Sequence, residues 1–286
     1  MKPTLPSDLE SAYAQCQHLA FGHYENFPVA SLLLSPDARP HVAALYAFAR
    51  TADDFADEDR FKGRRLREIN RWEAQFKKAL SGEKAPAPLL AFAHTLKTFQ
   101  IPISLPLDLL KAFRMDAVGH RFSSWNSLLD YCRHSANPVG RMVLLIHGYR
   151  TEKLHRYSDF ICTGLQLINF WQDTSIDLRR GRLYYPRTEL KKYGVSERSF
   201  CSGHNSPEGR RLVQHAVDAT EKIFNRGLPL LGGVQGRLKL ELKATYLGGQ
   251  GILNKIRAMD YNVLQNRPAW SAWDKTRLAF KALVGS

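Results

Sequence analysis

Apolar residues recur at intervals of three and four positions along almost the whole chain. This spacing places apolar side chains on one face of an α-helix, whereas the strict alternation typical of β-strands is nearly absent. Clusters of proline, glycine and serine separate the helical segments. We expect helices at about 7–20, 36–59, 62–81, 86–100, 106–117, 124–135, 138–150, 155–178, 208–227, 236–263 and 268–284. The pattern therefore predicts an all-α protein.

Two of these helices have strong start signals. Ser7 and Glu10 are spaced as a capping box, and Ser35-Pro36-Asp37 combines a cap, a proline in the first position and an acid in the first turn. The longest irregular stretch is expected at about 179–207, and loops of that length are usually functional or mobile. No internal repeat and no linker divides the sequence, so a single domain over residues 1–286 is the simplest expectation.

Composition adds a strong positive charge to this picture. The chain has 286 residues, of which 44% are hydrophobic, enough for a deep core. Its 41 Lys and Arg against 27 Asp and Glu give a formal net charge of +14. Such a chain could bind nucleic acid, anionic lipid or a polyanionic small molecule such as a diphosphate. The charge alone does not decide between them.

The cysteines and the N-terminus suggest a cytoplasmic protein. No CxxC pair occurs among Cys16, Cys132, Cys162 and Cys201, so we expect reduced, mostly buried cysteines without redox or zinc chemistry. Residues 1–10 lack the basic start and apolar run of a signal peptide, and no 18-residue apolar stretch occurs. We therefore expect a cytoplasmic protein without a membrane-spanning helix.

Two predicted helices each carry a polar stripe that ends in an aspartate pair. Residues three and four positions apart share a helix face. The stripe in the second predicted helix is Tyr46, Arg50, Asp53 and Asp57, with Asp54 beside it. The stripe in the helix expected at 155–178 is Gln166, Asn169, Asp173 and Asp177.

An acidic pair is usually part of a solvated helix face, but the neighbours of the second stripe argue against this. Apolar side chains cover most of the rest of that helix: Phe160, Ile161, Leu165, Leu167, Ile168, Phe170, Trp171 and Ile176. A helix that is apolar nearly all round is buried. Ionised aspartates are costly to bury without compensation, and a bound cation would compensate them. This interpretation predicts a cavity lined by carboxylates.

Oxygen ligands without His or Cys favour Mg²⁺ over Zn²⁺. Because Mg²⁺ typically bridges one or two carboxylates to substrate phosphates, the implied substrate carries a phosphate or diphosphate. Arg50 on the first stripe could bind the same anion, as could three arginines beyond the second: Arg179, Arg180 and Arg182. If the stripes face each other across a cleft with apolar walls, the site suits an anionic head and a hydrocarbon tail.

Three blocks of sequence resemble the squalene and phytoene synthase family of head-to-head prenyl synthases, and the resemblance covers almost the whole chain. The first block is Tyr46-Ala-Phe-Ala-Arg50-Thr-Ala-Asp53-Asp54-Phe-Ala-Asp57-Glu58. The second is Gln166-Leu-Ile-Asn169-Phe-Trp-Gln172-Asp173-Thr-Ser-Ile-Asp177, followed by Arg182-Leu-Tyr184-Tyr-Pro186. The third is Tyr131-Cys-Arg-His-Ser-Ala136-Asn-Pro-Val-Gly140.

The resemblance implies the all-α isoprenoid synthase fold with a central active-site cavity between helices. It implies Mg²⁺ ligands at Asp53, Asp57, Asn169, Asp173 and Asp177. It further implies diphosphate contacts from Arg50, Arg182, Tyr46, His23, Gln166 and Tyr184. Catalytic roles would fall to the four aspartates and to Tyr131, which would lie near the departing diphosphate and the cation.

Within the family, the segment His23-Tyr-Glu-Asn26-Phe27-Pro28 and the Asn-Phe-Trp-Gln-Asp run look most like the bacterial hydroxysqualene synthases of hopanoid biosynthesis. These convert presqualene diphosphate and water to hydroxysqualene and diphosphate. Gln172 departs from the broader pattern, where an arginine is common. Small residues also stand where many relatives are bulky, at Gly248, Gly249 and Gly251. The glycines at 232–236 lack the strand and acid of a Rossmann fingerprint, which weakly favours water over hydride from NADPH.

Other interpretations remain open. A prenyl transferase of the same family would make presqualene diphosphate or phytoene. A basic nucleic-acid-binding helical protein is the alternative from another class, but it leaves the aspartate stripes unexplained because carboxylates repel a phosphate backbone. Residues 268–286 mix aromatic and basic side chains, which fits both a peripheral helix at the inner face of the membrane and a helix docked on the domain. The sequence carries no signal for the oligomeric state.

Overall fold

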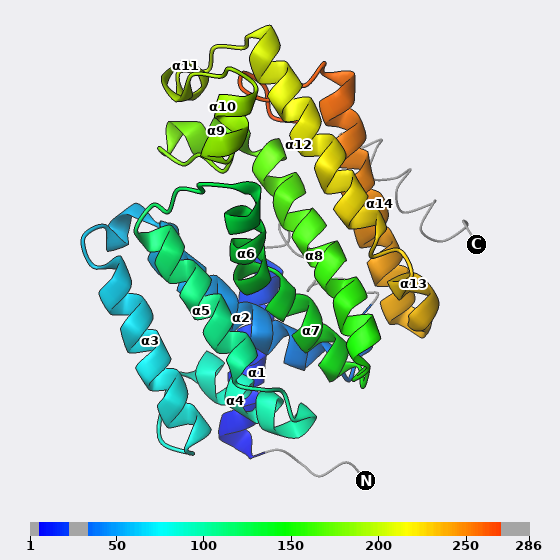
Figure 1. Ribbon diagram of the computed structural model, residues 1–286. Coiled ribbons are helices and arrows are strands. Elements are labelled where there is room, and N and C mark those ends of the chain that lie inside the picture. The colour runs from blue at the N-terminus through cyan, green and yellow to red at the C-terminus, as the bar shows by residue number, and fades with distance from the viewer. Residues whose placement is uncertain (1–5, 23–33, 270–286) are drawn as a thin grey trace. The chain divides into compact units, whose positions relative to one another are not determined.

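The computed structural model describes residues 6–22 and 34–269, and every regular element in these ranges is helical (Figure 1). The predicted all-α fold class is confirmed. The chain divides into two compact units. Unit 1 comprises Met1–Val118 and Pro138–Thr151, and unit 2 comprises Gly119–Asn137 and Glu152–Ser286. The single domain predicted from the sequence stays a prediction.

Unit 1 is built around α2, which contacts α1, α3, α4 and α5. Its core includes three stacked or tilted aromatic rings, with the Phe48 centroid 4.5 Å from that of Phe92 and 5.0 Å from that of Phe76. All three rings are fully buried, so their burial holds α2, α3 and α4 together. The helical segments of this part are α1 (Ser7–Gly22), α2 (Arg39–Asp57), η2 (Asp59–Phe61), α3 (Arg65–Leu80), α4 (Ala87–Phe99), α5 (Ser104–Ala117) and α7 (Asn137–Ile146).

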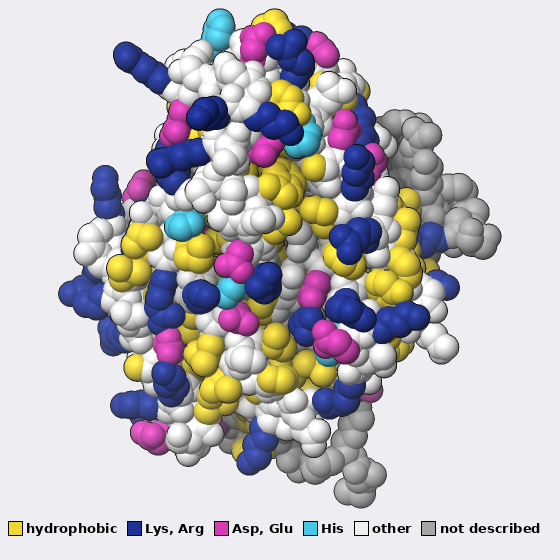
Figure 2. Space-filling view, in the orientation of Figure 1, with side chains coloured by type: hydrophobic (Ala, Val, Ile, Leu, Met, Phe, Trp, Pro, Cys, Tyr) yellow, Lys and Arg dark blue, Asp and Glu magenta, His cyan; other side chains and the backbone are white. Residues whose placement is uncertain are grey.

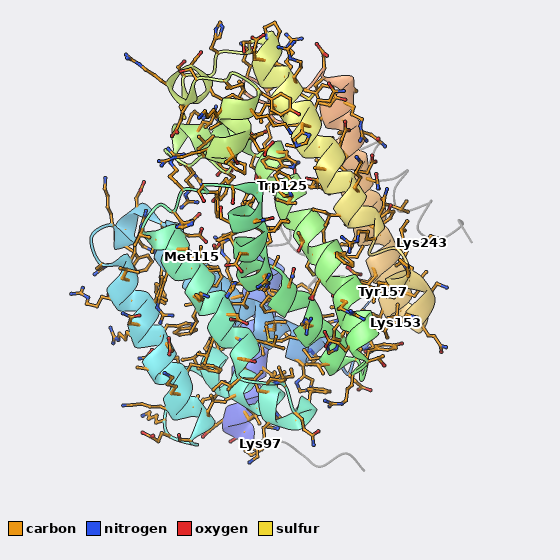
Figure 3. The ribbon with its side chains drawn as sticks, viewed as in Figure 1. Lys97, Met115, Trp125, Lys153, Tyr157 and Lys243 are labelled. Atoms are coloured by element: carbon orange, nitrogen blue, oxygen red, sulfur yellow. The ribbon has the colours of Figure 1, made fainter. Side chains whose placement is uncertain are left out.

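Unit 2 is built around α8, which packs against α6, α12, α13 and α14 (Figure 1). Trp171 of α8 is fully buried and donates a hydrogen bond to Thr220 of α12 at 2.8 Å. Trp125, labelled in Figure 3, begins α6 and stacks on Trp171 with 6.2 Å between centroids. The helices are α6 (Trp125–Ser135), α8 (Glu152–Gln172), α9 (Thr174–Arg179), α10 (Arg187–Lys192), α11 (Glu197–Cys201), α12 (Pro207–Asn225), α13 (Leu230–Gly233) and α14 (Gly236–Ala258).

Two glycines allow α8 and α14 to approach the fully buried ring of Phe224 on α12. A Cβ at Gly164 would lie 2.5 Å from Phe224 Cδ2, and a Cβ at Gly249 would lie 2.7 Å from Phe224 Cε1. Neither position has room for a side chain. Gly249 therefore allows close packing of α14 against α12.

Several predicted boundaries are wrong. The helix expected at 155–178 is interrupted, since α8 ends at Gln172 and α9 begins at Thr174. The stretch expected to be irregular at 179–207 contains α10 and α11. The second helix begins at Arg39 rather than directly after Ser35, because residues 36–38 form a turn first. The cysteines agree in part with expectation, since Cys16 and Cys132 are buried whereas the other two are partly exposed.

A hydrogen-bond cluster around Tyr13 joins three helices of unit 1. The Tyr13 hydroxyl lies 3.0 Å from His41 Nδ1, 2.8 Å from His94 Nδ1 and 2.9 Å from Thr95 Oγ1. Burial, helped by the neighbouring His94, lowers the pKa of His41 from 6.5 to about 4. Burial also lowers the pKa of His94, with Lys97 acting in the same direction.

The Tyr13 cluster predicts a loss of stability in mild acid. Because its pKa is depressed on folding, His41 binds a proton more readily in the unfolded chain, so the free energy of unfolding should fall as the pH drops from 6.5 towards 4. The measurement is the urea-unfolding midpoint across this range. We expect His41→Gln to flatten the dependence, whereas His18→Gln, at an exposed position on α1, should keep the wild-type slope. An unchanged slope in His41→Gln would contradict the assignment.

Candidate active site

The first aspartate stripe lies on α2, whose other face is buried from Val42 to Ala56. Arg50 lies between the carboxylates of Asp53 and Asp54. Its Nη2 is 2.8 Å from Asp54 Oδ1 and its Nη1 is 3.5 Å from Asp53 Oδ2. The three side chains are 21–40% exposed, so the predicted helical spacing places a cation among carboxylates at a partly solvated position.

Tyr46 and Asp57 flank this group on the same face of α2. Burial raises the pKa of the Tyr46 hydroxyl, while the nearby Arg50 acts in the opposite direction. The hydroxyl therefore stays protonated at neutral pH and can donate a hydrogen bond to an anion. At the other end, Arg65 of α3 donates to the backbone carbonyl of Asp57 at 3.2 Å, where a cation is favourable near a helix C-terminus.

The second aspartate stripe crosses the break between α8 and α9. Asp173 stands at the break with φ −94° and ψ 8°. Its N–H donates to Asn169 O at 2.8 Å, and the N–H of Asp177 donates to Asp173 O at 2.9 Å. These bonds preserve the spacing of four residues across the interruption. Asn169, Asp173 and Asp177 consequently keep their predicted order along one polar edge.

The surroundings of the second stripe agree only in part with the predicted burial. Buried apolar side chains do cover the rest of α8, namely Ile161, Leu167, Ile168, Phe170 and Trp171. The stripe itself is more open, because Asn169 is exposed whereas Gln166, Asp173 and Asp177 are partly exposed. These side chains are thus at least partly in contact with solvent, and the expectation of an internal stripe is wrong for Asn169.

Two contacts from residues 267 and 268 reach the second stripe. Arg267 Nε donates to Asp173 Oδ1 at 2.5 Å, with the two side chains 45% and 35% exposed. Gln172 Nε2 donates to the carbonyl oxygen of Pro268 at 2.8 Å. The sequence gives no sign of either contact, because 94 and 96 positions separate the partners.

Aromatic rings gather around the predicted site tyrosines of unit 2. Tyr131 is buried, and its ring lies 5.3 Å from that of Phe122 and 6.0 Å from that of Phe170. Tyr184 stacks on Phe170 with 3.7 Å between centroids and 9° between planes. Phe122 was not predicted to belong to the site, since its single position in an irregular segment shows no motif spacing. These rings form a packed aromatic cluster in the same unit as Asp173.

The structure places the predicted site residues in two groups. Tyr46, Arg50, Asp53 and Asp57 belong to unit 1, whereas Tyr131, Gln166, Asn169, Asp173, Asp177, Arg182 and Tyr184 belong to unit 2. The predicted facing of the two stripes stays a prediction. His23 lies outside the described residues, as does the C-terminal segment from 270 onward. Within residues 6–22 and 34–269, no three or more His, Cys, Asp or Glu side chains form a ready metal-binding group.

The charged surface matches the basic composition. Figure 2 shows Lys and Arg side chains spread over the viewed face, with fewer Asp and Glu among them. In the part of the chain that the structure describes, no helix combines the length and the apolar character needed to cross a membrane.

Comparisons with known proteins agree with the fold and with the sequence blocks. The squalene synthase HpnC from Alicyclobacillus acidocaldarius is a solved structure with a TM-score of 0.84 and 37% identity, covering 90% of this chain and 97% of that chain. The hydroxysqualene synthase of Zymomonas mobilis is 37% identical over 72% of this chain and 69% of its own length. That of Rhodopseudomonas palustris is 34% identical over 82% of this chain and 80% of its own length. Residues 21–274 match the squalene/phytoene synthase family, and the chain belongs to this family of enzymes.

Proposed function

We propose that this protein is a hydroxysqualene synthase that converts presqualene diphosphate and water to hydroxysqualene and diphosphate with the help of Mg²⁺. The observation that carries the proposal is the 37% identity to a hydroxysqualene synthase over 72% of the chain. Both aspartate stripes lie within the matched residues 21–274. Substrate, product and metal are all part of the proposal.

The residues present are chemically suited to Mg²⁺. The predicted ligands, Asp53, Asp57, Asn169, Asp173 and Asp177, supply only oxygen donors. In each unit a guanidinium contacts one of these carboxylates, Arg50 at Asp53 and Arg267 at Asp173, and these cation contacts support the proposed metal sites. One or two carboxylates in each stripe match the few protein ligands that Mg²⁺ takes when substrate phosphates and water complete its shell. When bound, Mg²⁺ would act as a Lewis acid that stabilises the departing diphosphate.

The remaining residues have roles that follow from their chemistry. Arg50 and Arg182 would bind diphosphate oxygens, and the protonated Tyr46 hydroxyl would donate a hydrogen bond to the same anion. Gln166, His23 and Tyr184 complete the diphosphate contacts that we propose. Tyr131, whose ring packs against Phe122 and Phe170, would lie near the departing diphosphate and the carbocation. Water, rather than hydride from NADPH, would then add to the cation through its oxygen and lose a proton to solvent, which gives the alcohol.

The setting of the reaction belongs to the same proposal. A prenyl diphosphate carries a long apolar tail, so delivery from a membrane surface to a cytoplasmic enzyme suits its chemistry. The basic exterior would favour an anionic inner leaflet. This makes the enzyme peripheral to the membrane, in a pathway to squalene and hopanoids.

Product analysis tests the reaction. The protein is incubated with Mg²⁺ and presqualene diphosphate, and in separate reactions with farnesyl diphosphate and with geranylgeranyl diphosphate, all without NADPH, and the lipids are identified by mass spectrometry. We expect hydroxysqualene from the first reaction and no condensation product from the other two. Formation of presqualene diphosphate from farnesyl diphosphate, or of phytoene from geranylgeranyl diphosphate, would instead identify a condensing prenyl transferase of the same family.

A further inference from the structure

Residues 262–269 form a short segment, here called the strap, that follows α14 and reaches the second aspartate stripe. Between the end of α14 and the strap, the chain turns at Asp260 and Tyr261, whose backbone φ angles are 50° and 58°. Left-handed conformations are unfavourable for such residues and persist only where the surroundings fix them. An ion pair between Arg210 and Asp260 helps to fix this turn. This turn therefore fixes the direction in which the strap leaves α14.

Both ends of the strap are anchored in unit 2. Val263 and Leu264 are buried at its start, with 0% and 7% exposure. At its other end Pro268 is buried, and its carbonyl oxygen accepts the hydrogen bond from Gln172. Asn266 and Arg267, between these anchors, are exposed. This arrangement holds the backbone while leaving the Arg267 side chain able to change partners.

The ion pair of Arg267 occupies an oxygen that the proposed function assigns to a metal. At 2.5 Å from Nε, Asp173 Oδ1 accepts a short, charge-assisted hydrogen bond. A divalent cation at the same oxygen would repel the guanidinium, so the two cations compete for Asp173. The adjacent Gln172 is a neutral amide, which anchors Pro268 without placing a second positive charge beside Asp173. The positive charge that contacts Asp173 thus comes from Arg267 of the strap and not from residue 172.

We propose that Arg267 is an exchangeable counter-ion of Asp173, which metal binding displaces, and that Gln172 is a positioning residue that holds the strap while this exchange takes place. The inference rests on the proposed function, because it takes Asp173 as a metal ligand. It gives Gln172 a specific task, which is to anchor the strap at Pro268. It also makes the metal affinity of the second stripe depend on a residue 94 positions away.

Metal binding without substrate tests the exchange. Mn²⁺ is titrated into the full chain and the unbound ion is followed by electron paramagnetic resonance. Partly exposed ion pairs contribute up to about 1 kcal/mol, so Arg267→Gln should tighten Mn²⁺ binding by up to about fivefold. Arg267→Lys, which keeps the charge, should stay close to wild type. Arg211→Gln removes an equal charge from a surface pair with Glu208 in the same unit and should leave the affinity unchanged.

The variant Asp173→Asn separates failure of the inference from failure of the proposed function. If the wild type shows no Mn²⁺ binding that Asp173→Asn removes, the metal assignment is wrong and the exchange is overturned with it. If such binding exists but Arg267→Gln leaves it unchanged or weaker, the metal assignment stands and the exchange alone is refuted. Tighter binding in Arg267→Gln supports the exchange.

Strap mobility tests the role of Gln172 without measuring activity. A nitroxide is attached to Asn266→Cys in a chain whose partly exposed cysteines, Cys162 and Cys201, are replaced by serine. In the wild-type strap, saturating Mg²⁺ should leave the label's mobility nearly unchanged, because the Gln172 bond remains. With Gln172→Ala, Mg²⁺ removes the second contact, and the mobile fraction should rise several-fold. A strap that stays immobile in Gln172→Ala with Mg²⁺ would overturn the anchoring role.

Discussion

Asp53→Asn and Asp173→Asn should each lower kcat/KM for diphosphate release from presqualene diphosphate by at least about a thousandfold. Each substitution keeps the size of the side chain and removes the charge that would hold the metal. A thousandfold loss corresponds to about 4 kcal/mol of transition-state stabilisation, a magnitude expected when a catalytic metal is lost. The measurement is the rate of diphosphate release at saturating Mg²⁺, with circular dichroism to confirm that the variants remain helical.

An aspartate outside the stripes provides the control for these variants. Asp130 of α6 is 53% exposed and pairs with Arg133 on its own helix, so Asp130→Asn should retain near-normal turnover. The same retention in Asp53→Asn or Asp173→Asn would refute the metal assignment of that residue. Loss in one stripe but not in the other would show that a single stripe supplies the catalytic metal.

Gly164→Ala should lower the free energy of unfolding by about 1–3 kcal/mol, because the new methyl group overpacks the core of unit 2. Its Cβ would lie 2.5 Å from Phe224 Cδ2 and 2.8 Å from Phe224 Cβ, which is attached directly to the α12 backbone. The ring cannot move away easily, since it is fully buried and stacks on Tyr246 with 4.7 Å between centroids. Urea unfolding of the purified variant measures the change.

The chain offers a matched control for this glycine. A Cβ at Gly232 would meet no atom within 4 Å, so Gly232→Ala makes the same chemical change in open space and should not destabilise the protein. The double variant Gly164→Ala with Phe224→Leu should recover part of the loss if the clash is its cause. Equal stability of the Gly164→Ala and Gly232→Ala variants would rule out the overpacking.

The amino-acid sequence predicted the features that depend on local spacing. The helices and the order of residues within each aspartate stripe follow from a period of three to four positions, and both stripes keep that order. The break at Asp173 was missed because hydrogen bonds from Asp173 to Asn169 and from Asp177 to Asp173 keep the helical spacing across it. A periodic pattern therefore looks continuous where the helix is not.

Contacts between distant parts of the chain were not predictable in the same way. Arg267 lies in an irregular segment, and only the folded structure shows that it reaches Asp173. Likewise, Gly164 and Gly249 leave room for Phe224, which belongs to a third helix, and only the folded structure shows these contacts. In the α10 and α11 region, helices of 6 and 5 residues are too short for a periodic pattern to emerge.

The interleaving of the two units has a consequence for synthesis on the ribosome. Unit 1 consists of Met1–Val118 and Pro138–Thr151, and Met142, Leu145 and Ile146 of α7 belong to its core. A nascent chain that has emerged only to residue 118 therefore lacks part of that core. Residues 119–137, which belong to unit 2, must emerge before unit 1 can be completed. An N-terminal part usually folds before the next part appears, but unit 1 of this chain cannot be completed in that order. Part of its core surface therefore stays exposed during translation and must be tolerated or shielded.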